Sequence, residues 1–240
     1  MMRTEIEAEF ALTAPAIEPR VKTAFCLMLG LDLADDATEQ PLAAPQQRAL
    51  DLALSYVAII LLFPLLLLTV LAVKLDSRGP ALFRQTRVGR DGSQFTLYKF
   101  RSMHIDAEER RAALLETSDR DGICFKSRND PRITRVGRFI RRFSIDELPQ
   151  ILNVLHGDMS IVGPRPALPS EVAAYPPHAF GRLAVNPGIT GLWQVSGRAE
   201  VSFDRMIDMD IEYARNRNLS MDVALILSTF RAVLSGRGAY

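Results

Sequence analysis

The sequence of 240 residues is poor in the side chains that build disulfide frameworks and metal centres. Its two cysteines, Cys26 and Cys124, stand far apart without a CxxC spacing, and three histidines, His104, His156 and His178, are scattered singly. This pattern excludes a disulfide scaffold and a cysteine zinc site, and it argues against a histidine metal site. It is compatible with a reducing compartment.

The chain also lacks a Walker loop, a GxGxxG sequence after a predicted strand, and an internal repeat. Its net charge of only +1 conceals an uneven distribution. Residues 1–73 contain 4 Lys and Arg against 9 Asp and Glu, residues 74–145 contain 17 against 9, and residues 146–240 contain 8 against 10. A basic middle third suits phosphate groups, anionic lipid head groups or nucleic acid, although a solvated basic face has the same composition.

One stretch lacks charge altogether. Leu52 to Val73 contains 22 uncharged residues, enough to match a hydrocarbon core of roughly 30 Å. Pro64, near its middle, removes a backbone hydrogen bond and kinks a helix, so the segment either crosses the bilayer or bends back to the side it entered. The positive-inside rule places its C-terminal side in the cytoplasm because five basic residues follow, namely Lys74, Arg78, Arg84, Arg87 and Arg90.

The remaining segments predict a mainly helical chain with one β-hairpin. Residues 1–48, rich in proline and acidic residues, read as a poorly ordered tail with at most one short helix, and their acidic start does not resemble a signal peptide. Residues 81–103 predict two strands around a turn at Asp91-Gly92. We expect helices at roughly 105–117, 131–142, 203–217 and 221–235, the last of them apolar enough to pack on the core or to contact lipid.

The expected helix over 131–142 has two unlike faces. Asn129-Asp130-Pro131 gives a helix start with proline at its first position. The apolar face consists of Ile133, Val136, Phe139 and Ile140. The opposite face carries Arg132, Arg135, Arg138 and Arg142. A helix lying in the head-group plane needs this pattern. A soluble amphipathic helix shares it, and the neighbouring hydrophobic segment favours the membrane interface.

Asp146 and Glu147 stand side by side after a run of arginines. Ser144 to Glu147 fits a capping box that opens a helix. A core-facing stripe then follows at Leu148, Ile151, Leu152 and Leu155, and Gly157 ends the helix. A capped helix alone would explain these residues, so a catalytic role for the acidic pair has to be argued from the rest of the chain. Two loops rich in glycine and proline follow, "GDMSIVGPRP" with Arg165 and "NPGITGLWQVSGR" with Trp193.

Adjacent carboxylates cannot flank a glycosidic bond from opposite faces as a glycosidase requires. A division of labour suits them better, with one carboxylate attacking phosphorus and its neighbour holding Mg²⁺ against phosphate oxygens. The positive end of the helix would keep the nucleophile ionised. Lys99, Arg141 and Arg165 could then clamp a diphosphate.

Four stretches resemble the bacterial polyprenyl-phosphate phosphoglycosyl transferases of the monotopic class, over about Leu50 to Tyr240. They are "YKFRSM" (98–103), "RRFSIDELPQILNVLHGDMSIVGPRP" (141–166), "NPGITGLWQVSGR" (186–198) and the closing "GRGAY". The resemblance implies an α+β, mainly helical fold with a re-entrant membrane helix hairpin, a short β-hairpin, amphipathic interfacial helices and a cytoplasmic catalytic domain. The implied parts are a tail over 1–48, a membrane helix over 49–75 and a phosphoglycosyl transferase domain over 76–240.

The resemblance also implies a reaction at the inner membrane. Asp146 would attack the β-phosphate of a UDP-sugar and expel UMP, Glu147 would bind Mg²⁺, and the phospho-sugar would pass to undecaprenyl phosphate to initiate exopolysaccharide, capsule or O-antigen synthesis. Lys99, Arg141 and Arg165 match basic positions of the family. The longer C-terminal region favours UDP-glucose or UDP-galactose as the donor. In some relatives serine precedes the proline of the hairpin, whereas this chain has Phe63.

The expected partners are the UDP-sugar, undecaprenyl phosphate and membrane lipid, without nucleic acid, and downstream membrane glycosyltransferases are candidate partners. Two other classes stay open on the residues alone. One is a membrane-anchored adaptor that uses its basic surface without catalysis and would tolerate loss of either carboxylate. The other is a phosphotransferase for soluble substrates with an incidental anchor, which would be indifferent to the polyprenyl acceptor.

Overall fold

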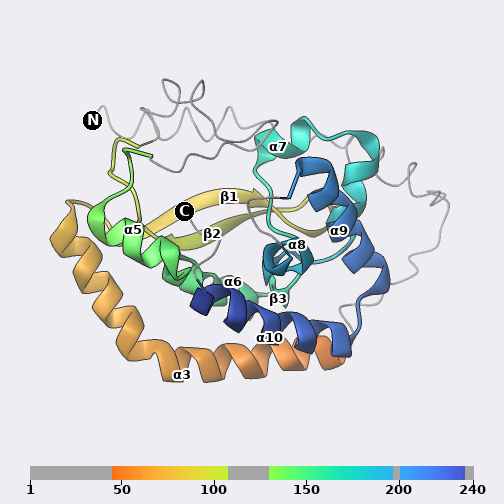
Figure 1. The fold of residues 1–240 in the computed structure, drawn as a ribbon, viewed down its shortest axis with the longest axis horizontal. Helices are drawn as coiled ribbons and strands as arrows, with labels where there is room; N and C mark the ends of the chain where they lie inside the picture. Colours follow the sequence, from red (N-terminus) through yellow and green to blue (C-terminus); the bar gives the residue numbers. More distant parts are fainter. Residues whose placement is uncertain (1–44, 108–129, 197–200, 236–240) are drawn as a thin grey trace. The chain divides into compact units, whose positions relative to one another are not determined.

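A computed structural model describes residues 45–107, 130–196 and 201–235 of the chain (Figure 1). Residues 39–240 form one structural unit. Along that unit the described part is mainly helical, with a two-stranded antiparallel hairpin and one short parallel strand pair. This agrees with the expected α+β, mainly helical class. The short helix expected within 1–44 and most of the charged helix expected over 105–117 lie outside the described residues.

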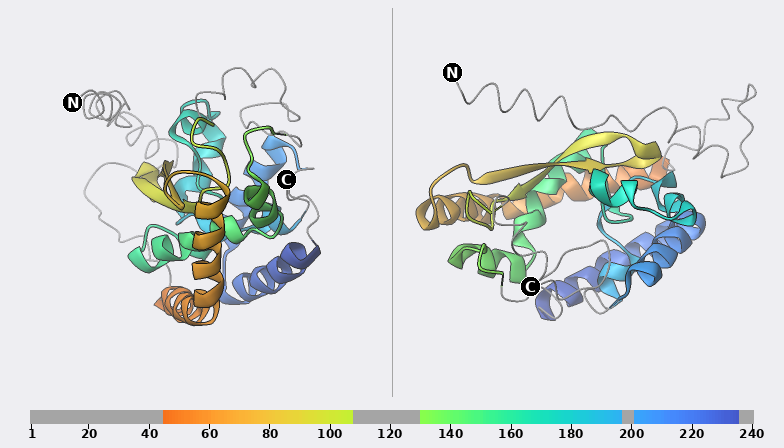
Figure 2. Two further views of the ribbon diagram at one scale, coloured as in Figure 1. Left: turned by 90° about the vertical axis from the view of Figure 1, so that its left-hand side faces the viewer. Right: turned by 90° about the horizontal axis from the view of Figure 1, so that it is seen from above.

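The uncharged segment forms one helix, α3, that runs from Pro45 to Asp76 and contains Pro64. It begins ahead of the expected boundary at residue 49. Among the described residues it is the one helix long and apolar enough to cross a membrane, and only 11% of its most apolar window is buried. Figures 1 and 2 show α3 bending midway, as a proline within a helix requires. The element is thus a single helix that bends midway, and the re-entrant hairpin stays a prediction.

Both ends of α3 are tied to the rest of the unit by buried polar contacts. Near its start, Gln47 Nε2 donates to Asp222 Oδ2 at 2.7 Å, and Asp51 accepts from the Ser160 hydroxyl at 2.6 Å and the Ile161 amide at 2.8 Å. At its other end, Asp76 accepts from the backbone amide of residue 136 at 3.0 Å. The middle is different, because most of its apolar side chains are exposed, although Leu66 and Val70 pack against the cluster around Val73.

The hairpin consists of β1 (Leu82–Val88) and β2 (Gln94–Phe100), paired antiparallel from Leu82↔Phe100 to Val88↔Gln94. The turn lies at Asp91-Gly92, as expected, and both residues have positive φ, at 55° and 77°. Asparagine, aspartate and glycine tolerate this conformation best. Behind the hairpin, Ala81, Phe100, Val73 of α3 and Ile140 form one hydrophobic cluster.

The arginine-rich helix, α5, spans Arg135–Arg142, so it begins four residues later than expected. The cap is Thr134, whose hydroxyl accepts from the Gly137 amide at 2.9 Å. Asp130, the expected start, instead holds the guanidinium of Arg132 at 2.7 Å, and both are buried. Arg132 therefore does not belong to the exposed arginine face, which keeps Arg135, Arg138 and Arg142.

The segment with the acidic pair is not the capped α-helix that the sequence suggested. Ile145–Gln150 forms a 3₁₀-helix, η3, before the six-residue α6 (Ile151–His156), and Ser144 has a left-handed φ of 54° with no side-chain cap. The tighter 3₁₀ turn changes the phase of the stripe. Leu152 is consequently 41% exposed, while Val154 is fully buried. Gly157 does end α6, with a φ of 94°.

The two glycine- and proline-rich loops each contain a short strand that the sequence did not suggest. β3 (Ser160–Val162) pairs in parallel with β4 (Gly188–Thr190). Their backbones approach so closely that a Cβ atom on Gly188 would lie 2.1 Å from the Gly163 nitrogen. Only glycine fits there. The pairing brings both loops together.

The rest of the unit is helical. Three short helical elements and two longer helices follow β3, namely α7 (Pro169–Ala173), η4 (Pro177–Ala184), α8 (Leu192–Val195), α9 (Phe203–Asn216) and α10 (Leu219–Ser235), and β4 lies between η4 and α8. The expected helices at 203–217 and 221–235 are thereby found, the second starting slightly earlier. Tyr213 of α9 and Leu225 of α10 close a cluster over Val162 and Val185.

Candidate active site

The predicted site forms where β2 passes beside η3. Lys99 lies near the end of β2, and its Nζ donates to Glu147 Oε1 at 2.7 Å. The Lys99 side chain is 19% exposed and that of Glu147 is 31% exposed. Residues 48 positions apart in the sequence are thus joined by an ion pair that solvent, or a substrate, can reach.

Asp146 lies next to this pair and is buried, at 8% exposure. Burial, and then the charge of Glu147, raise the pKa of its carboxyl group, Lys99 and Arg141 act in the opposite direction, and the net result is a pKa of about 6. A carboxylate that has lost most of its hydration but keeps its charge near neutral pH is poised as a nucleophile.

For Glu147 the neighbouring charges outweigh burial, and the pKa of its carboxyl group is lowered. Burial alone would raise the pKa of its carboxyl group, but the charge and hydrogen bond of Lys99, followed by the charges of Arg165 and Arg141, hold it below its usual value. The two neighbouring carboxylates therefore differ in basicity. The structure brings all five predicted residues, Asp146, Glu147, Lys99, Arg141 and Arg165, into one electrostatic neighbourhood.

Local backbone geometry explains why Asp146 and Arg141 meet. Arg141 is in the last turn of α5, and the chain then reverses through Ser144, whose left-handed conformation is rare for a residue other than glycine. The amide of Ser144 donates to the Arg141 carbonyl at 3.1 Å, and that of Glu147 to the Ser144 carbonyl at 3.2 Å. Two consecutive tight turns thus place the acidic pair directly beside the arginines.

Arg165 is the one exposed residue in a run of buried ones from Val162 to Ala167. Two buried arginines that the sequence did not single out contact this loop: Arg87 donates to the Pro166 carbonyl at 2.9 Å and Arg182 to the Arg165 carbonyl at 3.0 Å. Asp210 pairs with Arg182 at 2.6 Å. These three residues stand singly in ordinary helix and strand sequence, so no local pattern distinguishes them.

The residues present fit Mg²⁺ only in combination with a substrate. Among the described residues no group of three or more His, Cys, Asp or Glu side chains gathers to hold a metal ion. Mg²⁺, however, is commonly bound through one or two carboxylates together with phosphate oxygens and water. Glu147 would provide one carboxylate, and a diphosphate would complete such a ligand set.

Comparison with known proteins identifies the family of the chain. The family model described as bacterial sugar transferase matches residues 42–236. The undecaprenyl-phosphate galactose phosphotransferase of Salmonella typhimurium is 44% identical over 81% of this chain and 41% of its own length. The UDP-glucose:undecaprenyl-phosphate glucose-1-phosphate transferase of Caulobacter vibrioides is 42% identical over 81% of this chain and 72% of its own length. The exopolysaccharide production protein ExoY of Rhizobium meliloti is 36% identical over 84% of this chain and 91% of its own length.

The chain therefore belongs to the bacterial sugar transferase family, which confirms the resemblance read from its motifs. It spans less than half the length of several relatives, 36% of a galactosyl transferase of Streptococcus agalactiae among them. The matched region begins at residue 42 and so includes the whole of α3 together with the site.

Proposed function

We propose that this chain transfers a sugar-1-phosphate from a UDP-sugar to undecaprenyl phosphate through a covalent intermediate on Asp146, with release of UMP. The observation that carries the proposal is the buried Asp146 beside the accessible Lys99–Glu147 pair, among the charges of Arg141 and Arg165. Two relatives bear names that specify galactose and glucose transfer to this lipid. UDP-galactose and UDP-glucose are accordingly the proposed donors.

In the first step an Asp146 oxygen attacks the β-phosphorus of the UDP-sugar, and the bond from that phosphorus to the bridging oxygen breaks. The bridging oxygen leaves with UMP. Arg141 and Arg165 are placed to bind the diphosphate oxygens, where a guanidinium offers two parallel hydrogen bonds. The aspartyl phospho-sugar keeps the phosphate that was the β-phosphate of the donor.

In the second step a phosphate oxygen of undecaprenyl phosphate attacks the same phosphorus and displaces the Asp146 carboxylate. The product is a lipid diphosphate sugar, and Asp146 returns to its starting state. Lys99 stabilises the negative charge of Glu147 between turnovers, since its ammonium group lies 2.7 Å from that carboxylate. Two in-line displacements by different nucleophiles need only one phosphoryl site.

Glu147, together with the diphosphate, is the proposed holder of Mg²⁺. When bound there, Mg²⁺ would neutralise charge on the phosphate oxygens. The accessible position of Glu147, 31% exposed at its side chain, permits exchange of Lys99 for another positive partner.

We place α3 in the inner membrane as a re-entrant helix. A helix that crosses the bilayer has its ends on opposite sides, yet both ends of α3 are bound to one unit, through Gln47 and Asp51 at the start and Asp76 at the end. Between them, side chains such as Ile60, Leu61 and Phe63 are 60–72% exposed. Lipid is the solvent that suits this convex apolar segment.

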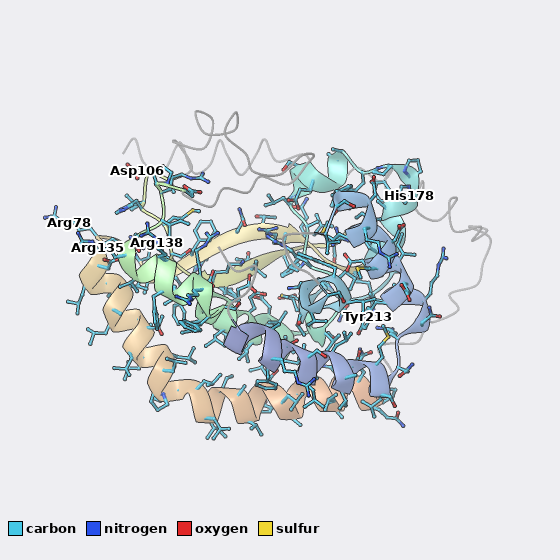
Figure 3. The ribbon with its side chains drawn as sticks, in the orientation of Figure 1. Arg78, Asp106, Arg135, Arg138, His178 and Tyr213 are labelled. Atoms are coloured by element: carbon cyan, nitrogen blue, oxygen red, sulfur yellow. The ribbon has the colours of Figure 1, made fainter. Side chains whose placement is uncertain are left out.

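Interfacial contacts support the same orientation. Phe139 of α5 is 60% exposed beside the exposed Arg135 and Arg138, and in the view of Figure 3 these two arginines lie on the same side of the molecule as Arg78, which follows α3. On α10 an exposed apolar stripe recurs at helical spacing, at Leu219, Val223, Leu227 and Phe230. An apolar stripe with neighbouring cations fits anionic head groups. UDP-sugars are cytoplasmic, so the site faces the cytoplasm.

The activity is tested by measuring UMP release from a panel of UDP-sugars, with and without undecaprenyl phosphate. We expect sustained release only when the lipid phosphate is present, with UDP-glucose or UDP-galactose as the best donor. A membrane-anchored adaptor would release no UMP, and a phosphotransferase for soluble substrates would turn over without the lipid. Either result would overturn the proposed function.

The topology is tested by cysteine labelling in a background without Cys26 and Cys124. Gln46→Cys and Thr86→Cys both introduce exposed thiols, the first at the start of α3 and the second in β1, beyond the other end of α3, whereas the neighbouring Gln47 is buried. We expect an impermeant reagent to label both from the cytoplasmic side only. Labelling of Gln46→Cys from the periplasm would mean that α3 crosses the membrane.

Pro64→Leu provides the complementary test of topology. Leucine restores the missing backbone hydrogen bond and removes the cause of the bend. A straightened α3 cannot keep both of its ends on the unit, so we expect partial movement of residue 46 to the periplasmic side and loss of activity. Ala58→Leu, a substitution outside the bend, serves as the control and should keep the wild-type labelling pattern.

A further inference from the structure

Each carbonyl of the loop Pro164–Ala167 accepts a hydrogen bond from a residue outside the loop. The Pro164 carbonyl accepts from the Gly188 amide at 2.8 Å, and the Ala167 carbonyl from the Val88 amide at 2.9 Å. Between them, the Arg165 carbonyl accepts from Arg182 and the Pro166 carbonyl from Arg87. Four consecutive carbonyls are therefore fixed, and two of the four residues are prolines with a restricted φ.

Only the side chain of Arg165 leaves this fixed loop. Its neighbours Pro164 and Pro166 are buried, and Arg165 is exposed with a positive charge that acts on Glu147. A long arginine side chain has considerable rotamer freedom, so a rigid backbone limits the directions in which the guanidinium can point. The loop is thus a rigid support that holds the Arg165 guanidinium near Asp146 and Glu147.

The Arg182 guanidinium links this loop to helix α9. It lies on η4, is 3% exposed, contacts the Tyr175 hydroxyl and pairs with Asp210 of α9, which is 1% exposed. Its hydrogen bond to the Arg165 carbonyl is made from the same nitrogen, Nη2, that faces Asp210. The Asp210 carboxylate therefore lies against the nitrogen that donates to the loop.

We propose that Arg182, oriented by Asp210, is a positioning residue that acts on the reaction through Arg165, with Arg87 as a second support at the next carbonyl. The role rests on the proposed function, in which Arg165 binds the diphosphate of the donor. Neither Arg182 nor Asp210 contacts the substrate. Their contribution is to preorganise the one cation of the site that is carried by a loop.

The decisive experiment is a double-mutant cycle with Arg165. Arg182→Met together with Asp210→Asn removes the donor without leaving a buried charge unpaired. We expect this change to lower kcat/KM for the UDP-sugar by about 10- to 100-fold in the wild-type background. In the Arg165→Ala background the same change should cost less than about threefold, because the group that it positions is already absent.

A matched control is the buried pair Arg132–Asp130, whose arginine likewise donates to a backbone carbonyl, that of Ala107, at 3.1 Å. Arg132→Met with Asp130→Asn should cause the same fractional loss whether or not Arg165 is present. Arg87→Met is a second test variant that leaves the Arg182–Asp210 pair intact, and it should also couple to Arg165. Equal losses in both backgrounds for the Arg182 variant would assign it a purely structural role and overturn the proposal.

Hydrogen exchange supplies a readout that does not depend on activity. The amides of Gly188 and Val88 are bonded to the loop, so peptides that contain them should exchange faster in the Arg182→Met/Asp210→Asn protein and not in the Arg132→Met/Asp130→Asn protein. Unchanged exchange would mean that Arg182 does not hold the loop. If wild type releases no UMP while the loop does loosen, the proposed function fails and the holding of the loop by Arg182 stands.

Discussion

Two ion pairs lie near Arg165, and they are nearly identical in length but opposite in access. Lys99 and Glu147 approach to 2.7 Å with 19% and 31% of their side chains exposed, whereas Arg182 and Asp210 approach to 2.6 Å with 3% and 1% exposed. Distance alone therefore does not separate a functional pair from a supporting one. The proposed function requires the open pair to exchange partners with a diphosphate or a cation, and it requires no such exchange of the closed pair.

The largest effect should come from the carboxylate beside the open pair. Asp146→Asn keeps the shape of the side chain but supplies a poor nucleophile. We expect kcat to fall by more than about a thousandfold, while the protein still inserts and unfolds at nearly the wild-type temperature. Near-normal turnover in this variant would show that Asp146 is not the nucleophile.

Glu147→Gln should be the next most severe change. An amide is a weaker ligand than a carboxylate for a hard cation, so we expect roughly a 100-fold loss of activity and a weaker dependence on Mg²⁺. EDTA should stop the wild-type reaction. Full activity of wild type in EDTA would remove Mg²⁺ from the mechanism.

The closed pair should respond in the opposite way. Asp210→Asn leaves the Arg182 guanidinium buried without its counter-charge and should lower the free energy of unfolding by about 3–5 kcal/mol. Glu147→Gln, in the open pair, should change that free energy by less than about 1 kcal/mol. Thermal or denaturant unfolding in detergent measures both. Similar losses of stability for the two variants would abolish the distinction between the pairs.

Single cations of the site should have smaller effects. Lys99→Ala and Arg165→Ala should each lower kcat/KM for the UDP-sugar by about 10- to 100-fold, because each removes a charge close to the diphosphate. Arg205→Ala, on the exposed face of α9, is the matched control and should retain nearly full activity. Equal losses at all three positions would indicate a diffuse basic surface instead of a defined clamp.

The smallest expected effect is a shift of the pH profile. Asp146 attacks as a carboxylate, and its pKa is raised to about 6, so kcat/KM should be level above that pH and fall as pH decreases through it. Lys99 lowers this pKa. Lys99→Met should therefore move the acid limb to higher pH, and Arg205→Met should not. An acid limb that stays in place in the Lys99 variant would contradict the assignment.

Prediction from the sequence succeeded where the signal is local. The turn at Asp91-Gly92, the end of α6 at Gly157 and the two C-terminal helices each depend on a few neighbouring residues. The capping box at Ser144 failed although its pattern was correct. Pro149 lies four residues beyond Ile145, and a backbone without its amide hydrogen cannot complete a regular α-helical turn there, so η3 forms instead.

Long-range contacts account for what the sequence could not reveal. Asp146, Glu147, Lys99, Arg141 and Arg165 were predicted from motifs, yet nothing local indicates that Lys99 pairs with Glu147. Arg182 and Asp210 are 28 positions apart in unremarkable helical sequence, and Gln47 bonds to Asp222 across 175 positions. Such partners are determined by the packing of whole helices and strands. The polar residues at the ends of α3 are therefore explained only by their contacts in the folded unit.

The central claim is a covalent phospho-sugar on Asp146, and mass spectrometry of the intact protein tests it most directly. Wild type incubated with the UDP-sugar and Mg²⁺ but without undecaprenyl phosphate should release up to one equivalent of UMP and gain the mass of one sugar phosphate. Peptide mapping should place that mass on Asp146, and adding the lipid phosphate should remove it. Absence of the adduct under these conditions, or its location on another residue, would contradict the mechanism.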